Sequence, residues 1–255
     1  MFPDPHQAVI VGAAGAIGRA TCRAFAAAGA SLWALDLDER AASEALTGLP
    51  GEHRSRAVDV TDAEAITGLA AEICRQHPID SVVYAPGLVF TADVAATEWA
   101  SYRRLMAVNL DGAFYCAQAF VRPMLATKRA GSFVFISSMA GKRGEAGASA
   151  YCASKFGLIG MVESFAAETA ADGIRANAVC PGNVDSPMLK KVAVDIAARE
   201  GREVETVWQE MAEVAAAKRL VNPDEVAAVC LWLCSSAASA VTGEAINVDA
   251  GALSG

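Results

Sequence analysis

The chain has 255 residues, of which 54% are hydrophobic and 20% charged, and its formal net charge is −8 at pH 7. The length suffices for one sizeable α/β domain with a substantial core. The negative charge, without any block of Lys and Arg, argues against a nucleic-acid-binding protein. No run reaches the roughly 18 apolar residues of a membrane helix, and the first residues do not form a secretory signal. We therefore expect a soluble, cytoplasmic protein.

The seven cysteines stand singly within apolar stretches, which is unlike the disulfide framework of a short secreted protein. Cys230 and Cys234 are spaced to share a helix face, but none of the three histidines is near them in the sequence. We expect buried, reduced thiols and no metal site.

Short runs of β-forming residues alternate with helical patterns along almost the whole chain. Strands are expected at 7–12, 31–36, 55–59, 80–85, 132–137, 174–180 and 244–248. Helices are expected at 16–28, 38–47, 62–76, 98–127, 150–171 and 223–235. This alternation predicts a single Rossmann-type α/β domain over residues 1–255, with a doubly wound parallel sheet of about seven strands flanked by helices.

The segment 186–220 stands apart from this alternation and has the pattern of one or two amphipathic helices. In a doubly wound fold, an insertion after the carboxyl end of a strand lies over the ligand crevice. Two interpretations remain open: a lid over the substrate, or a solvated helix pair on the surface.

Three glycines, Gly12, Gly15 and Gly18, lie between the first predicted strand and a helix that begins near Ala16. Such a turn lets a diphosphate approach the backbone and the free N–H groups of the helix. The spacing alone is weak evidence, and an ordinary turn remains open. Asp36 ends the second strand, where an acid accepts hydrogen bonds from a ribose diol and repels a 2′-phosphate. Alternatively, Asp36 caps the helix that starts near Asp38.

A third group of residues suggests proton transfer. Tyr151 and Lys155 are spaced i, i+4 and share one helix face. A tyrosine with a pKa of about 10 is a poor base at neutral pH, so we expect the neighbouring ammonium of Lys155 to lower that pKa. Ser138, at the end of a strand, offers a hydroxyl to the same substrate carbonyl oxygen.

Taken together, these motifs make the chain similar to the short-chain dehydrogenase/reductase family over essentially its whole length. The matching positions, in family order, are Gly12–Gly18, Asp59-Val60, Asn109, Ser138, Tyr151 with Lys155, and Pro181-Gly182. The resemblance implies an NAD-dependent oxidoreductase that interconverts a small secondary alcohol and its ketone. The region from Ser186 onward resembles the lids of polyol, diol and 3-hydroxybutyrate dehydrogenases, which implies a polyol, diol or hydroxy acid as substrate.

The resemblance also implies roles for individual residues. The catalytic tetrad would be Asn109, Ser138, Tyr151 and Lys155, with Tyr151 as general acid/base and Asn109 supporting a water-linked proton path. The residues that bind the cofactor would be Gly12, Gly15, Ala16, Ile17, Gly18, Asp36, Leu37, Asp59, Val60, Tyr84, Ala85, Gly87, Tyr151, Lys155, Pro181, Gly182, Val184 and Ser186. Substrate contacts would come from Ser138, Tyr151 and Met188.

The sequence departs from the family pattern in several places, among them Val11 for Thr in the glycine turn and Ser186 where a Thr often contacts the cofactor. Ala16 replaces the middle glycine of the usual turn, which requires a negative φ at Ala16. Residues Tyr84 to Gly87 read Tyr-Ala-Pro-Gly where the family has Asn-Asn-Ala-Gly, so the side-chain hydrogen bonds of the asparagines are lost.

Several alternatives accompany this interpretation. A 3-oxoacyl-carrier-protein reductase shares the architecture but usually prefers NADPH, which Asp36 disfavours. The extended branch of the superfamily shares the glycine spacing but generally carries a larger C-terminal domain. A non-catalytic dinucleotide-binding sensor is the third alternative. By resemblance we expect a homotetramer, with a dimer as the alternative.

Overall fold

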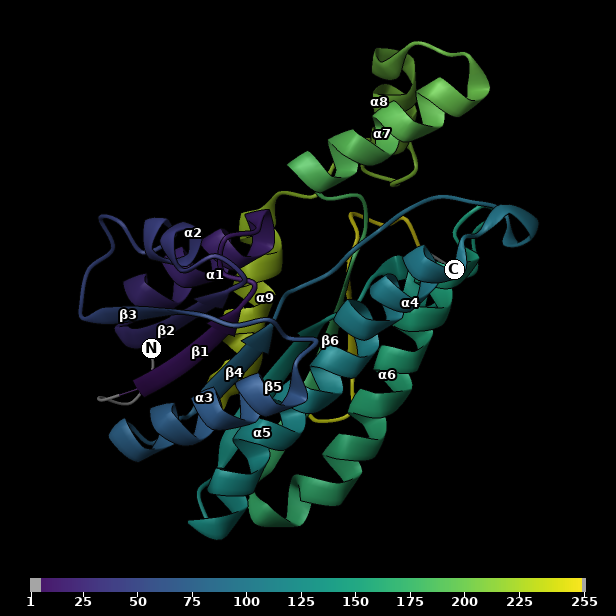
Figure 1. The fold of residues 1–255 in the computed structure, drawn as a ribbon. Helices are drawn as coiled ribbons and strands as arrows, with labels where there is room; N and C mark the ends of the chain where they lie inside the picture. The colour runs from purple at the N-terminus through teal and green to yellow at the C-terminus, as the bar shows by residue number, and fades with distance from the viewer. Residues whose placement is uncertain (1–5, 254–255) are drawn as a thin grey trace.

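The computed structural model describes residues 6–253, and its centre is a seven-stranded sheet with helices on both faces (Figure 1). The strand order is β3-β2-β1-β4-β5-β6-β7, and every neighbouring pair is parallel. The strands are β1 (His6–Val11), β2 (Ala30–Asp36), β3 (His53–Ala57), β4 (Ser81–Tyr84), β5 (Gly131–Ile136), β6 (Ile174–Pro181) and β7 (Ala245–Val248). The predicted doubly wound sheet is confirmed. Residues 1–5, on which the prediction of no secretory signal partly rests, lie outside the described residues.

The strand order reverses between β1 and β4, because the chain moves outward from β1 to β3 and then returns to the other side of β1. In open α/β sheets, ligands bind outside the carboxyl ends of the strands at such a switch point. The fold therefore places a crevice beyond Val11 and Tyr84, the last residues of β1 and β4.

Helices cover the two faces of the sheet. One face is covered by α1 (Ala16–Ala27) and α9 (Pro223–Cys234), which pack together, and the other by α3 (Ala63–Gln76), α5 (Gly112–Ala126) and α6 (Ser149–Thr169). The short helix α2 (Glu39–Glu44) lies against β2 and β3. Within residues 6–253, no helix is both long and apolar enough to span a membrane.

The strand sequences are apolar on both faces because each face packs into its own core. Val9 and Val11 belong to the cluster beneath α3, α5 and α6, whereas Ala8 and Ile10 belong to the cluster beneath α1 and α9. Successive side chains of a strand point to opposite faces, so both sets are buried. This explains why the first strand shows a continuous apolar run.

Side-chain caps place two of the helix starts. Asp62 accepts hydrogen bonds from the backbone N–H groups of Glu64 and Ala65, as expected for the start of the third predicted helix. Asn222 and Glu225 form a capping box at the start of α9.

The helix predicted at 98–127 is confirmed as one uninterrupted helical stretch over 99–126, which contains a π-helical turn that was not predicted. The chain forms α4 (Trp99–Met106), a π-helical turn at Ala107–Asp111, and then α5. Within this turn the carbonyl oxygen of Val108 accepts a hydrogen bond of 2.6 Å from the Tyr84 hydroxyl, and the Asn109 side chain is fully buried. π-turns inside helices occur frequently at functional sites.

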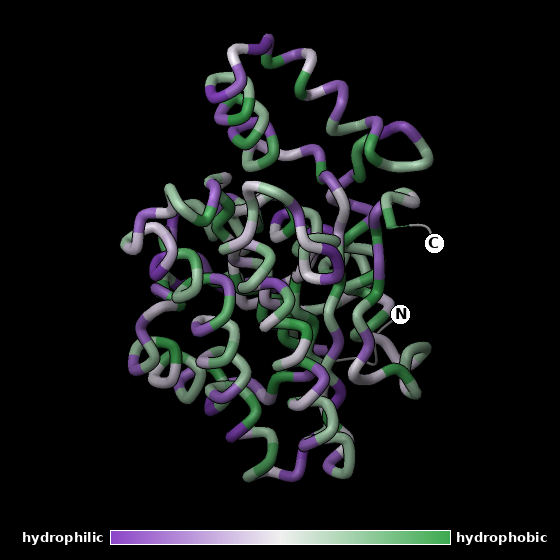
Figure 2. Tube along the Cα trace, turned by 90° about the vertical axis from the view of Figure 1, so that its right-hand side faces the viewer, coloured by the Kyte–Doolittle hydropathy of each residue, from purple (hydrophilic) through white to green (hydrophobic). Residues whose placement is uncertain are grey.

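The segment 186–220 forms two helices, α7 (Pro187–Glu200) and α8 (Val204–Glu213), which stand beyond the carboxyl ends of the strands (Figure 1). We call α7 and α8 the lid. Along both helices hydrophilic and hydrophobic residues alternate, at the top of Figure 2. The lid has a small apolar cluster of its own, in which Ala193, Ala197 and Val207 are buried.

Candidate active site

Two adjoining cavities lie in the crevice predicted by the strand order. The larger, of about 650 Å³, lies between the lid and the ends of β5 and β6. The smaller, of about 520 Å³, lies beyond the ends of β1, β2 and β3. Both are lined by Gly15, Ala85, Pro86, Gly87 and Met188, so they form one groove.

The glycine turn forms part of the wall of both cavities. Gly12 has a φ of +74°, and a Cβ there would lie 2.7 Å from the backbone nitrogen of Pro86. A Cβ on Gly18 would lie 2.0 Å from the carbonyl oxygen of Gly12. Ala16 begins α1, and its φ is not positive. An alanine can therefore occupy this position, where the family usually has a glycine.

The start of α1 fits an anionic ligand. Gly15 is the N-cap, no side chain caps the helix, and its first turn contains no acidic residue. The backbone N–H groups of the first turn therefore face the groove without a carboxylate competing for them, which is the arrangement that binds a diphosphate.

Asp36 lies at the groove and is held in place by backbone donors. Its carboxylate accepts hydrogen bonds from the N–H groups of Ala14 at 2.9 Å and Leu37 at 2.8 Å. Asp38, not Asp36, caps α2, by accepting from the N–H of Arg40. The alternative that Asp36 is merely a helix cap is therefore wrong. Both Asp36 and Leu37 line the smaller cavity.

Asp59 and Val60 follow β3 and line the same cavity. The pKa of Asp59 is lowered, chiefly because its carboxylate accepts hydrogen bonds from the hydroxyl and the N–H of Thr61. Arg104 also lines this cavity and stabilises the charged form of Asp59.

The loop after β4 departs from the predicted set of cofactor contacts. Ala85 and Gly87 line both cavities, but the side chain of Tyr84 is 1% exposed and packs in the core against α5. The predicted contact of Tyr84 with the cofactor stays a prediction, and it does not involve the aromatic ring, whose hydroxyl donates a hydrogen bond to Val108.

Asn109 lies behind the cavity wall. Its side chain accepts a hydrogen bond from the N–H of Leu88 at 2.7 Å and donates one to the carbonyl oxygen of Leu88 at 2.9 Å. It also donates to the Ser154 hydroxyl at 3.0 Å. Asn109 thus fixes the loop after β4 against α6, and the predicted water-linked proton path through it stays a prediction.

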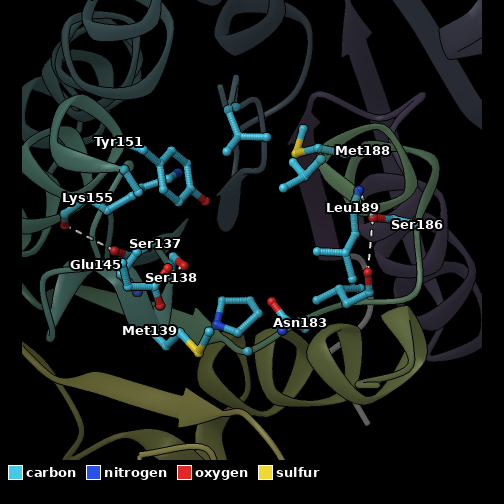
Figure 3. Close-up of a pocket in the computed structure, with 18 of the residues that line it drawn as sticks. Ser137, Ser138, Met139, Glu145, Tyr151, Lys155, Asn183, Ser186, Met188 and Leu189 are labelled. Atoms are coloured by element: carbon cyan, nitrogen blue, oxygen red, sulfur yellow. Dashed lines mark hydrogen bonds between the residues drawn. The ribbon is translucent and has the colours of Figure 1, made fainter. Parts of the chain in front are cut away.

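The other three residues of the predicted tetrad converge on the larger cavity. Ser138 follows β5, and Tyr151 and Lys155 lie on the first turns of α6. The Lys155 amine lies 5.8 Å from the centroid of the Tyr151 ring and donates a hydrogen bond of 2.8 Å to the carbonyl oxygen of Ile136. In Figure 3 the Tyr151 hydroxyl points into the cavity on the side of Ser138.

Burial favours the neutral forms of both titratable groups. It raises the pKa of Tyr151 to about 12, and the hydrogen bond with Ser138 only partly offsets this. Burial lowers the pKa of Lys155 to about 8. The sequence predicted that Lys155 lowers the pKa of Tyr151. In the structure the pKa of Tyr151 is raised instead, and Lys155 is not among the groups that affect it. The Tyr151 hydroxyl therefore keeps its proton at neutral pH.

The turn after β6 forms the floor of the larger cavity, where Pro181, Gly182, Val184 and Ser186 all line the wall. The Ser186 hydroxyl donates to the carbonyl oxygen of Val184 at 3.1 Å and accepts from the N–H of Leu189 at 3.2 Å, so it caps α7. Ile17 and Met188, also predicted from the sequence, lie on the walls of this cavity.

The sequence analysis missed several residues of the larger cavity. Among them are Glu145, Asn183 and a set of apolar lid residues, namely Leu189, Val192, Ile196, Met211 and Val214. The helical spacing of Leu189, Val192 and Ile196 is a signal that identifies one face of α7. No comparable signal marks Glu145, because its place depends on how the loop before α6 folds.

In the described residues 6–253, no group of three or more His, Cys, Asp or Glu side chains is placed to hold a metal ion. All seven cysteines lie in this range and are unpaired, and six of them are buried.

Comparison with known proteins agrees with this geometry. The family model described as "Enoyl-(Acyl carrier protein) reductase" matches residues 12–252. The chain is 39% identical to a galactitol 2-dehydrogenase (L-tagatose-forming) of Cereibacter sphaeroides, covering 97% of this chain and 95% of that protein. It is 32% identical to the (3R)-3-hydroxyacyl-CoA dehydrogenase of Homo sapiens, covering 96% and 95%.

Among solved structures, a single-residue variant of the actinorhodin polyketide ketoreductase with NADPH superposes with a TM-score of 0.92 at 28% identity, over the full length of both chains. The strand order, the groove at the switch point and these relatives lead to one conclusion. The chain belongs to the short-chain dehydrogenase/reductase family of oxidoreductases.

Proposed function

We propose that this protein is an NAD-preferring dehydrogenase that interconverts a small secondary alcohol and its ketone, with polyols, diols and hydroxy acids as the first substrate classes to test. The observation that supports this proposal best is that one groove contains both the proton-transfer residues and the predicted cofactor turn. The hydroxyls of Tyr151 and Ser138 line the cavity that also contains the glycine turn at the start of α1.

The residues present fit a nicotinamide dinucleotide. The first-turn N–H groups of α1 would bind the diphosphate, and Asp36 would accept hydrogen bonds from the adenosine ribose. The turn Pro181-Gly182 and the backbone of Val184 would hold the nicotinamide. The bound cofactor supplies or accepts the hydride.

The protein's own contribution to the chemistry is proton transfer and positioning. In ketone reduction, the protonated Tyr151 donates its proton to the carbonyl oxygen while the Ser138 hydroxyl hydrogen-bonds the same oxygen. In alcohol oxidation, Tyr151 must first lose its proton, and a positive charge on Lys155 would stabilise the phenolate. Asn109 acts through the loop after β4, which it fixes by two hydrogen bonds to Leu88.

The preference for NAD rests on Asp36. Its carboxylate is fixed at the smaller cavity by two backbone N–H groups, and it would lie against the 2′-phosphate of NADP. The neighbouring Leu37 is 69% exposed and offers no positive charge to that phosphate. An NADPH-dependent 3-oxoacyl-carrier-protein reductase is the second candidate, favoured by the 34% identity of the chain to the 3-oxoacyl-[acyl-carrier-protein] reductase of Thermotoga maritima.

The test is a cofactor and substrate assay of the wild type and Tyr151→Phe. We expect NAD to support secondary-alcohol oxidation at least about tenfold more efficiently than NADP. Tyr151→Phe should lower kcat by about 100-fold or more while NAD binding, followed by quenching of tryptophan fluorescence, changes little. Unchanged turnover in Tyr151→Phe would contradict the proposed chemistry, and NAD binding without any turnover in the wild type would indicate a sensor.

We also propose a homotetramer, or a dimer as the alternative, in the cytoplasm. Large apolar side chains are exposed on three helices that cover one side of the molecule, namely Trp99 on α4, Phe114 on α5 and Phe156 on α6. Such exposure is typical of surfaces that bury against a second copy. The seven unpaired thiols support a reducing compartment.

A further inference from the structure

The lid presents an apolar face to the larger cavity. Leu189, Val192 and Ile196 lie three and four residues apart on α7 and all line the cavity. Met211 and Val214, at the end of α8, extend this face. We call these five residues the lid wall.

The lid wall lies opposite the reacting groups. In Figure 3, Met188 and Leu189 face Tyr151 and Ser138 across the open cavity. A molecule whose reacting carbon lies at the Tyr151 hydroxyl would therefore extend its remaining atoms toward α7.

The lid wall overlaps only partly with the apolar residues that hold the lid together. The buried residues of the lid core are Ala193, Ala197 and Val207, and Ile196 and Met211 pack against them, whereas neither Leu189 nor Val192 belongs to that core. Packing α7 against α8 therefore does not explain why Leu189 and Val192 are apolar. Both are only half-buried, and Val214 is 46% exposed.

Most charged residues of α7 lie away from the cavity. Lys190 pairs with Glu205 at 3.8 Å and Lys191 with Asp195 at 2.7 Å, and none of these four residues lines the cavity. Arg199, near the end of α7, is the exception and lines the cavity.

Charged residues of both signs line the cavity. Glu145 lies close enough to Tyr151 that its carboxylate opposes ionisation of the phenol and raises its pKa. Arg143, Lys155 and Arg199 also line the cavity, and the Arg199 guanidinium donates to Glu200 at 3.4 Å. The selective feature of the cavity is therefore the apolar lid wall and not the sign of its charges.

We infer that the preferred substrate is a secondary alcohol, or its ketone, whose apolar chain or ring lies against the lid wall. This inference rests on the proposed dehydrogenase function and favours apolar alcohols over the polyols, diols and hydroxy acids named there. An apolar chain displaces water from Leu189, Val192 and Ile196 and is stabilised there. A polyol would instead bring hydroxyls against side chains that cannot hydrogen-bond them.

The reaction balances with the proposed cofactor alone. A bound NAD⁺ would accept the hydride of the carbinol C–H bond, the hydroxyl proton passes to the deprotonated Tyr151, and Tyr151 then releases it to solvent, so that the products are the ketone, NADH and one proton. The lid wall makes no bond in this step and contributes only binding.

The experiment measures kcat/KM for NAD reduction with 2-butanol, 2-hexanol and 2-octanol, and in parallel with galactitol, 3-hydroxybutyrate and a 3-hydroxybutyryl thioester. We expect kcat/KM to rise by about fourfold for each added methylene, the value for full transfer of a CH₂ group out of water. Between 2-butanol and 2-octanol this amounts to about two orders of magnitude.

A matched pair of variants locates the effect on the lid wall. Val192→Thr replaces a methyl by a hydroxyl on the cavity face, and Val194→Thr makes the same change two residues away. Val194 is 45% exposed and belongs neither to the cavity wall nor to the lid core. Val192→Thr should lower kcat/KM for 2-octanol by about three- to tenfold, with a smaller loss for 2-butanol, whereas Val194→Thr should leave both unchanged.

Each outcome either supports or overturns the inference. If galactitol, 3-hydroxybutyrate or the thioester is oxidised more efficiently than 2-octanol, or if kcat/KM does not depend on chain length, the inference is overturned while the dehydrogenase function stands. If Val192→Thr and Val194→Thr lower activity equally, the lid wall does not select the substrate and the inference is again overturned. If no alcohol reduces NAD, the proposed function itself fails.

Discussion

At the scale of single residues, the proton of Tyr151 is the central feature of the site. Burial raises the pKa of this phenol to about 12, and the Lys155 amine donates its hydrogen bond to Ile136. The same burial lowers the pKa of Lys155 to about 8. In this buried site a charged Lys155 would stabilise the Tyr151 phenolate more strongly than in water. The same burial, however, disfavours the charged form of Lys155.

Glu145 provides a way to test this electrostatic balance. Its carboxylate disfavours the Tyr151 phenolate, so Glu145→Gln should lower the pKa of Tyr151. Alcohol oxidation needs the phenolate, which forms as the pH rises. The rising limb of the pH profile of kcat/KM should therefore move to lower pH, and kcat/KM at pH 7 should increase about twofold to fivefold.

The control for this change is Glu163→Gln, which lies on the helix that carries Tyr151 but outside the cavity; it should leave the pH profile in place. A profile for Glu145→Gln that moves to higher pH would show that Glu145 assists ionisation of Tyr151 instead of opposing it.

At the scale of elements, the contact between β4 and the helix pair α4–α5 accounts for the unusual sequence after β4. Tyr84 fills the core and donates to Val108 in the π-helical turn. Gly112 makes this contact possible, since a Cβ there would lie 2.6 Å from the Tyr84 hydroxyl oxygen and 2.9 Å from the carbonyl oxygen of Val60. Tyr84 and Gly112 thus form one packing unit that holds Asn109 at the site.

We predict that Gly112→Ala lowers the free energy of unfolding by about 1–3 kcal/mol, because the new methyl overpacks a closed site. Gly68 on α3 is the matched control, since a Cβ there would meet no atom within 4 Å. Gly68→Ala should raise stability by up to about 1 kcal/mol through helix propensity. Urea unfolding followed by circular dichroism measures both variants, and a Gly112→Ala protein as stable as Gly68→Ala would contradict the packing argument.

At the scale of the whole molecule, the lid is a unit that packs mainly on itself. Its buried core contains only Ala193, Ala197 and Val207 among the described residues, whereas both sheet faces contribute large clusters. The lid joins the sheet through the bridge between Val184 and Val221 and through the Asn183 amide, which donates to the carbonyl oxygen of Met211 at 2.8 Å. Units with few buried apolar contacts open at lower free energy than the rest of a protein.

Val207→Ala should therefore loosen the lid without unfolding the sheet. Loss of two buried methyl groups costs about 1–3 kcal/mol, so cleavage by thermolysin within 187–213 should accelerate about fivefold or more. The urea midpoint of the whole protein should change little.

Val226→Ala provides the comparison, because Val226 on α9 is fully buried in the core beneath α1 and α9. It should lower the urea midpoint clearly and leave the early cleavage of the lid unaltered. Equal losses in the urea midpoint for the two variants would mean that the lid unfolds together with the sheet.

Much of the fold was predictable because local sequence and tertiary packing agree. The apolar runs that end at Val11 and Asp36 form strands, and caps such as Asn222 start helices where expected. The helix expected at 98–127 is confirmed, but its π-helical turn was not predictable, because the turn accompanies a hydrogen bond from Tyr84 of β4. The burial of the Tyr84 ring was not predictable for a related reason, since only the packing of β4 on α5 decides that this ring faces the core.

The sequence by itself determined the order of strands and helices, the glycine turn, the acid after β2 and the spacing of Tyr151 and Lys155, because each depends on residues close together in the chain. The tertiary structure decided which side chains face one cavity, which groups are buried deeply enough to change their pKa, and that the lid wall lies opposite Tyr151. These properties depend on distances between residues far apart in the sequence and on the exclusion of water between them. For this reason the class of chemistry was predictable from motifs, whereas the preferred substrate had to be inferred from the walls of the cavity.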